Sequence, residues 1–188
     1  INSEQRLHIM TIEDPIEYLH PQGQALLHQR ELGPHVADYC SGIRQAVRLG
    51  AEVIVISELA DGETLEAVLE AVESGCLVFA GFDASSVVGA CMELPMLVSQ
   101  EERPRMRVRL AQALRAVTAQ TLLPCAHQQA RVPMVEILIN NSVVRKHILE
   151  GREGELREYL RTVEARQAGM VDFNQSLMDL VEREMIHV

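Results

Sequence analysis

A strand–helix–strand pattern in residues 51–86 constrains the fold of this chain more than any other stretch. Val53–Ile56 is an unbroken β-branched run, too short for a helix and too apolar for a strand with a solvated face, so it predicts a strand covered on both sides. Asp61, a good helix cap, precedes apolar residues at helical spacing (Leu65, Val68, Leu69 and Val72). Leu77–Phe82 predicts a second buried strand. Such strands are parallel with a right-handed crossover, which indicates an α/β fold.

Acidic residues follow the predicted strands. Glu58 comes just after the first strand of this unit and Asp83 just after the second. Glu13 and Asp14 likewise follow a strand predicted at His8–Ile12. Parallel sheets bind ligands beyond the carboxyl ends of their strands, and acids placed there can hold Mg²⁺ or orient a nucleophilic water. The spacing alone leaves two possibilities open, a site or a set of solvated loop residues.

Arginines lie between these two groups of acids. Ala25–Leu32, which carries Arg30, predicts a second strand or a hairpin arm, and residues 35–49 predict a helix that stops at Gly50. Arg44 and Arg48 share one face of that helix because they are four residues apart. Two guanidinium groups on one face can clamp a phosphate, or they can be a solvated stripe with ion-pair partners.

The second half of the chain is predicted to be mainly helical. A long amphipathic helix is expected at Ser99–Gln120, with a solvated or subunit-facing arginine patch at its start, followed by a short antiparallel pair of Leu122–Leu123 with Val135–Ile139. The other expected helices are Ser86–Glu93, Asn141–Glu150, Gly154–Arg166 and Asp172–Glu184. We therefore expect an α/β core in residues 1–125 and a mainly helical subdomain in residues 126–188.

Composition excludes several classes of protein. The net charge of −10 over 188 residues argues against nucleic acid as the main partner, since phosphate binding needs a basic surface. No apolar run approaches the roughly 20 residues of a membrane span. The four cysteines are scattered without a C-x-x-C pair, which indicates reduced thiols rather than a metal site or a disulfide framework. The chain opens without Met and runs almost at once into a strand, so we expect it to begin inside a domain.

Several motifs together resemble the hexameric secretion and pilus motor ATPases, in particular the type IV pilus retraction motors of the PilT/PilU group. Residues 11–18 (TIEDPIEY) are similar to the family's acidic box, and residues 53–58 (VIVISE) to its Walker B strand with the catalytic glutamate. Residues 29–31 with 43–48 resemble the segment that bears phosphate-directed arginines, and residues 114–122 resemble the LRAVxxQxL helix. The resemblance implies a partial RecA-like P-loop NTPase sheet, mostly parallel and flanked by helices, followed by a small helical carboxyl-terminal subdomain.

The same resemblance implies roles for individual residues. Glu58 would be the acid that orients the attacking water, and Glu13 would join it in holding Mg²⁺. ATP would be contacted by a further set, consisting of Arg44, Arg48, Arg30, Asp14 and Asp83. The implied partners are the other motor subunits of a homo- or hetero-hexameric ring and the inner-membrane platform protein of the pilus. The implied location is cytoplasmic and peripheral to the inner membrane.

The chain also departs from the family pattern. The P-loop motif G-x-x-x-x-G-K-[ST] is absent, and the only lysine, Lys146, lies in the carboxyl-terminal region. Asp83 stands where the family has a histidine, and further differences fall at Cys76, Ala60 and Pro34. Three hypotheses stay open: part of a working retraction motor, a degenerate ring subunit that modulates an active partner, and a metal-dependent hydrolase that uses Glu13, Asp14, Glu58 and Asp83.

Overall fold

A computed structural model describes residues 1–127 and 129–187 of the chain. The chain divides into two compact units, residues 1–83 and residues 84–188, and each is described by itself. The domain boundary predicted after residue 125 lies inside the second unit, just after strand β5 (Ala116–Pro124). The boundary between the two compact units therefore falls after residue 83, earlier in the chain than the predicted domain boundary.

The first unit is built on a parallel four-stranded sheet. Its strands are β1 (His8–Glu13), β2 (Leu26–Glu31), β3 (Val53–Ile56) and β4 (Leu77–Ala80), in the order β2-β1-β3-β4. This arrangement confirms the α/β prediction, and it makes β2 a parallel sheet strand rather than a hairpin arm. The strand predicted at Leu77–Phe82 is present as β4, but the prediction that it is buried was wrong. β4 ends at Ala80 and is an edge strand, so Leu77 and Phe79 stay 42% and 46% exposed.

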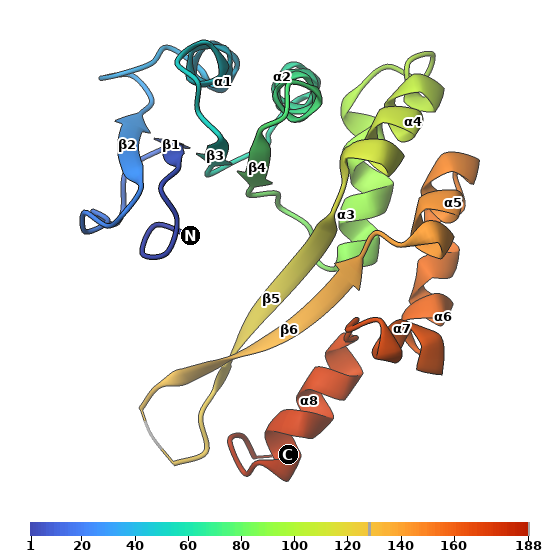
Figure 1. Ribbon diagram of the computed structural model, residues 1–188. Coiled ribbons are helices and arrows are strands. Elements are labelled where there is room, and N and C mark those ends of the chain that lie inside the picture. Colours follow the sequence, from blue (N-terminus) through green and yellow to red (C-terminus); the bar gives the residue numbers. More distant parts are fainter. Residues whose placement is uncertain (128, 188) are drawn as a thin grey trace. The chain divides into compact units, whose positions relative to one another are not determined.

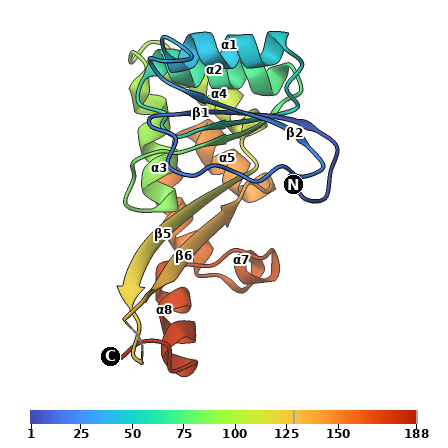
Figure 2. The same cartoon turned by 90° about the vertical axis from the view of Figure 1, so that its left-hand side faces the viewer.

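Helices α1 (Tyr39–Arg48) and α2 (Gly62–Glu73) lie side by side on one face of this sheet (Figures 1 and 2). Asp38 and Asp61 cap them, each carboxylate accepting a backbone N–H at 2.7 Å, so the predicted role of Asp61 is confirmed. Alternate strand residues point toward these helices and are fully buried, namely Met10, Ile12, Ile54 and Ile56. The same alternation turns Thr11, Glu13 and Gln29 to the opposite face.

The second unit combines one β-hairpin with short helices (Figure 1). The hairpin pairs β5 with β6 (Arg131–Ile139), and α8 (Phe173–Glu182) packs on β6. The other helices are α3 (Val87–Glu93), α4 (Arg103–Ala113), α5 (Ser142–Glu150), α6 (Leu156–Leu160) and α7 (Val163–Gln167), with 3₁₀ turns at Leu94–Leu97 and Glu153–Glu155.

The long helix predicted at Ser99–Gln120 was wrong. α4 ends at Ala113, and the following residues form β5, which pairs with β6 from Ala116↔Ile139 to Pro124↔Arg131. The side-chain amide of Asn140 donates to the carbonyls of Ala111 and Leu114 at 3.0 and 2.8 Å. These bonds satisfy carbonyl groups that have no partner at the end of the helix. The hairpin is therefore much longer than the short antiparallel pair that the sequence predicts.

The helix predicted at Gly154–Arg166 is divided in two. Thr162 separates α6 from α7 because its hydroxyl accepts the backbone N–H of Ala165 at 3.2 Å and starts a new helix. Val163, the first residue of α7, is 64% exposed. The predicted helices at Asn141–Glu150 and Asp172–Glu184 are confirmed as α5 and α8, with Asn141 and Asp172 as their caps.

One of the arginines at the start of α4 forms a buried ion pair. Arg107 Nε lies 2.9 Å from Glu153 Oε1, and the Glu153 side chain is only 3% exposed. The arginine-rich start of α4 is therefore not only the solvated or subunit-facing patch that the sequence predicts. The pair joins α4 to the 3₁₀ turn before α6.

The thiol of Cys91 in α3 is expected to be unreactive in the native protein. Burial and then the nearby Glu153 carboxylate raise its pKa to about 12, so it stays neutral at pH 8. Because the pKa of Cys91 in the folded protein lies above its ordinary value of 9.0, the stability that the neutral thiol contributes is complete below pH 9 and is lost as the pH rises toward 12.

We expect iodoacetamide at pH 8 to label Cys91 only after urea unfolding, whereas the half-buried Cys125 is labelled in the native state. Peptide mass spectrometry gives both rates. Equal native labelling rates at the two thiols would contradict the assigned burial.

Candidate active site

The carboxyl edge of the first unit's sheet holds a hollow of about 430 Å³. Acids from three strand ends line it, and the complete lining is Glu13, Asp14, Pro15, Glu17, Ser57, Glu58, Gly81, Phe82 and Asp83. The structure thus brings together the predicted acids that follow β1, β3 and β4. It does so because parallel strands end at the same edge of a sheet.

Glu13 is the most firmly held acid of this hollow. The Thr11 hydroxyl donates to Glu13 Oε1 at 2.5 Å, and the Gln29 amide donates to the same oxygen at 2.9 Å. Hydrogen bonds to a carboxylate are stronger than those between neutral groups. The side chain of Glu13 is therefore fixed by its own strand and by the neighbouring strand β2.

Ser57 and Tyr39 belong to the site, although sequence reasoning did not single them out. The Ser57 hydroxyl accepts the backbone N–H of Asp14 at 3.2 Å and lies 2.7 Å from the Tyr39 hydroxyl. These contacts join the acidic loop after β1 to the end of β3 and the first turn of α1. A serine next to a strand-end acid gives no sequence signal for them, because both partners are distant in sequence.

Gly81 allows the end of β4 to approach the loop that carries Glu58. The Gly81 N–H donates to the Ile56 carbonyl at 3.0 Å, and the Gly81 carbonyl accepts from Leu59 N–H at 2.8 Å. A Cβ atom at position 81 would lie 2.0 Å from the Ser57 carbonyl oxygen, so no larger residue fits without backbone movement.

The predicted arginines do not line the hollow. Arg44 Nε lies 3.5 Å from Glu70 Oε2 in an exposed pair, and Arg30 donates to the Gln45 side chain at 2.9 Å. Arg48 is the last residue of α1, about 14 Å along the helix axis from Tyr39, the first. Within this chain the acids are therefore gathered and the arginines are not.

The charge of the hollow sets what it can hold. Its lining contains five carboxylates and no lysine, arginine or histidine, so by itself it does not fit the phosphates of a nucleotide. Carboxylate oxygens do fit Mg²⁺, which usually takes one or two of them together with water and substrate phosphate. Among residues 1–127 and 129–187 no group of three or more His, Cys, Asp or Glu is arranged to hold a metal. The hypothesis of a hydrolase with Glu13, Asp14, Glu58 and Asp83 as a metal-ligand set thus finds no support.

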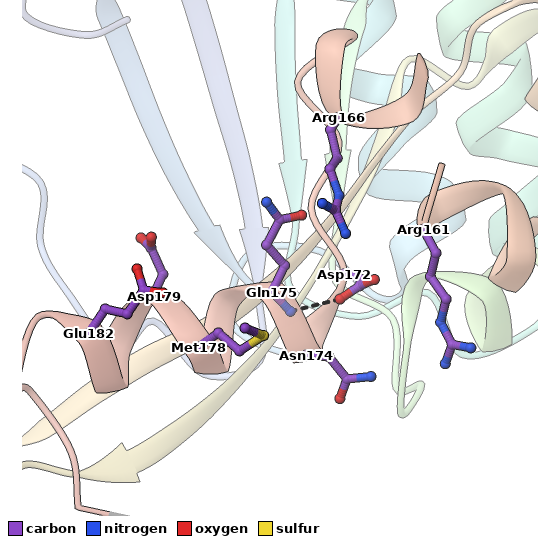
Figure 3. A pocket seen from close by; sticks show the side chains of 8 residues that line it. All are labelled: Arg161, Arg166, Asp172, Asn174, Gln175, Met178, Asp179 and Glu182. Carbon is purple, nitrogen blue, oxygen red and sulfur yellow. Dashed lines mark hydrogen bonds between the residues drawn. The ribbon is translucent and has the colours of Figure 1, made fainter. Parts of the chain in front are cut away.

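A second hollow, of about 400 Å³, lies in the second unit beside α8 (Figure 3). Residues of both charges line it: Arg161, Arg166, Asp172, Asn174, Gln175, Met178, Asp179 and Glu182. The Asp172 carboxylate already accepts the Gln175 N–H at 2.7 Å as the cap of α8. This hollow contains none of the predicted site residues.

The parallel sheet, with its acids at the carboxyl edge, defines an α/β protein whose fold resembles those of the pilus retraction motor PilT and the ATPase DotB of Legionella pneumophila. The family model described as "Type II/IV secretion system protein" matches residues 1–183. The chain belongs to this family, as its motifs predict.

Similar proteins include an uncharacterized protein, YggR, of Escherichia coli (strain K12), which is 38% identical over 176 residues, covering 94% of this chain and 53% of that protein. A twitching motility protein of Neisseria gonorrhoeae is 35% identical over 99% of this chain and 49% of its own length. The crystal structure of the pilus retraction motor PilT with bound ADP superposes with a TM-score of 0.89 at 28% identity, covering 100% of this chain and 52% of that one. The chain thus spans about half the length of these relatives.

None of the described helices, in either unit, is both long and apolar enough to cross a membrane.

Proposed function

We propose that this chain is part of a hexameric motor ATPase that couples ATP binding and hydrolysis to pilus retraction. The observation that carries the proposal is the gathering of Glu13, Glu58 and Asp83 in one hollow of a chain that belongs to the secretion-motor family. The motor would work in the cytoplasm against the inner membrane, with the pilus platform protein as its membrane partner.

In this proposal the acids divide the work at the nucleotide. Glu58, exposed at the end of β3, orients the attacking water, and Glu13 joins it in holding Mg²⁺. Mg²⁺, when bound, neutralises charge that develops on the phosphate oxygens. Asp14 fixes the acidic loop through its backbone bond to Ser57.

The cations of the site are proposed to come from outside this hollow. Its lining has five carboxylates and no basic side chain, so the phosphates need positive charge from another part of the ring. Arg44 and Arg48 are exposed on α1, and Arg30 donates to Gln45 of the same helix. We propose that these three arginines act toward the nucleotide of a neighbouring subunit. Preorganised charges of this kind stabilise the transition state of phosphoryl transfer by several kcal/mol.

One observation favours a second candidate function, a non-catalytic ring subunit that modulates an active partner. Asp83 adds a carboxylate to the hollow, at a position where the resemblance to the motor family implies a histidine. An extra anion at this position repels a γ-phosphate unless a cation neutralises it.

A chimera distinguishes the two candidates. The 186 residues of this chain that align with the Neisseria twitching motility protein replace the matched segment of that protein, and ring assembly, ADP binding and ATP hydrolysis are measured. For a working motor we expect rings that hydrolyse ATP, with Asp83→His raising the rate about tenfold because it removes the repelling charge. Rings that bind ADP but do not hydrolyse ATP, with or without Asp83→His, would instead support the modulating subunit.

A further inference from the structure

A polar stripe occupies one end of the sheet face opposite α1 and α2. Thr11 pairs with Gln29 and Glu13 with Glu31 in the register of β1 and β2, so side chains of all four residues emerge on this face. The other end of the same face is apolar and contains the buried cluster of Ile9, Ala25 and Val53. The stripe therefore begins where the hydrophobic packing ends, next to the acidic hollow.

The side-chain amide of Gln29 is fully engaged within this stripe. Its Nε2 donates to Glu13 Oε1 and to the Tyr18 carbonyl, both at 2.9 Å, and its Oε1 accepts the His20 N–H at 2.9 Å. A flipped amide would place its oxygen against two acceptors and its NH₂ group against a donor. The hydrogen-bond network thus allows a single orientation of Gln29.

The contacts of Glu13 are one-sided. Thr11 and Gln29 both donate to Oε1, and no donor among the described residues bonds Oε2. The carboxylate is held in one orientation while its second oxygen remains available to a water or a metal ion. Gln29 also holds the loop of residues 15–20 through its bonds to the backbone of Tyr18 and His20. In this loop Tyr18 and Leu19 are 62% and 78% exposed.

We propose that Gln29 is a positioning residue for Glu13, holding Oε1 so that Oε2 faces a metal-bound or free water in the hollow. The inference rests on the proposed function, because it gives Glu13 a role toward Mg²⁺. Displacement of the exposed loop would remove the Gln29 donor from Glu13, so this amide also couples the loop to the acid.

The test uses the full chain with Mn²⁺ as the probe. Gln29→Met keeps the length of the side chain but removes both the donors and the acceptor. Gln29→Glu keeps the acceptor for His20 and turns an oxygen toward Glu13, and it serves if the Met variant does not fold. Gln24→Met is the matched control, since Gln24 donates to the Ser3 carbonyl at 3.2 Å away from Glu13.

Two readouts separate the inference from the proposed function. Side-chain ¹³C relaxation reports the order of Glu13, and paramagnetic broadening of its signals reports Mn²⁺ affinity. In Gln29→Met we expect a more mobile Glu13, a His20 amide that exchanges roughly tenfold faster, and about tenfold weaker Mn²⁺ binding, with no such changes in Gln24→Met. In Gln29→Glu, which keeps the acceptor for His20 and adds a carboxylate, we expect only the greater mobility of Glu13. A metal-positioning role predicts this loss of Mn²⁺ affinity in the folded Gln29→Met chain, whereas a merely structural role predicts a lower melting temperature with the Mn²⁺ affinity of the folded chain unchanged.

Each outcome decides one of the two claims. A Glu13 that is equally ordered in wild type and in both Gln29 variants overturns the positioning role. If Glu13 becomes mobile in the Gln29 variants but the wild-type chain binds no Mn²⁺, the positioning contact is supported and the proposed metal role of the hollow is overturned.

Discussion

Replacing Glu58 by Gln in the Neisseria chimera is expected to lower kcat for ATP hydrolysis by about 10²–10³-fold. The amide has the same shape as the carboxylate, but it cannot accept a proton or hold an attacking water by charge. Glu58 is exposed at the end of β3, so its substitution leaves the packing unchanged. Steady-state hydrolysis by the assembled ring measures the loss, and a KM close to that of the parent chimera would place it in the chemical step.

Glu63→Gln is the matched control for this experiment. Glu63 is an exposed acid in the first turn of α2, outside the hollow, and its loss removes the same charge from the same unit. We expect its kcat to stay within about twofold of the parent. A Glu58→Gln chimera that retains the parent rate would remove Glu58 from the proposed mechanism.

Removing Arg107, the partly buried partner of the buried Glu153 carboxylate, is expected to destabilise the second unit by about 3–5 kcal/mol. Arg107→Met leaves the Glu153 carboxylate, 3% exposed, without the guanidinium that lies 2.9 Å from it. The cost of an uncompensated buried charge exceeds that of the lost packing. Labelling of Cys91 in increasing urea follows the unfolding of this unit, because Cys91 is buried in α3.

Arg183→Met supplies the comparison. Arg183 pairs with Asp179 at 2.8 Å, but both side chains are more than half exposed, so its removal should cost less than about 1 kcal/mol. In the double variant Arg107→Met/Glu153→Leu we expect much of the loss to be regained, since no buried charge remains. Equal urea midpoints for Arg107→Met and Arg183→Met would contradict the structural role of the buried pair.

Local patterns sufficed for much of the first unit. The β-branched run Val53–Ile56 and the capping acid Asp61 each specify their element through near neighbours, and both predictions are confirmed. The gathering of Glu13 with Glu58 also follows from the sequence, because a parallel sheet brings its strand ends to one edge.

Long-range contacts explain where the sequence was insufficient. Residues 114–120 have an apolar pattern that suits a helix, but pairing with β6 and the Asn140 amide direct them into β5. Arg44 pairs with Glu70 on another helix, and the donors that fix Glu13 include Gln29 on a different strand. Neither partnership leaves a signal in local spacing.

The five carboxylates of the hollow have a consequence for how a nucleotide would approach it. Five carboxylates in one concavity produce a negative potential that slows the diffusion of free polyanions and enriches divalent cations near the sheet edge. A nucleotide already complexed with magnesium carries about half the charge of the free tetra-anion and meets a correspondingly lower barrier. Ionic strength and magnesium supply would then affect the rate at which the nucleotide is captured.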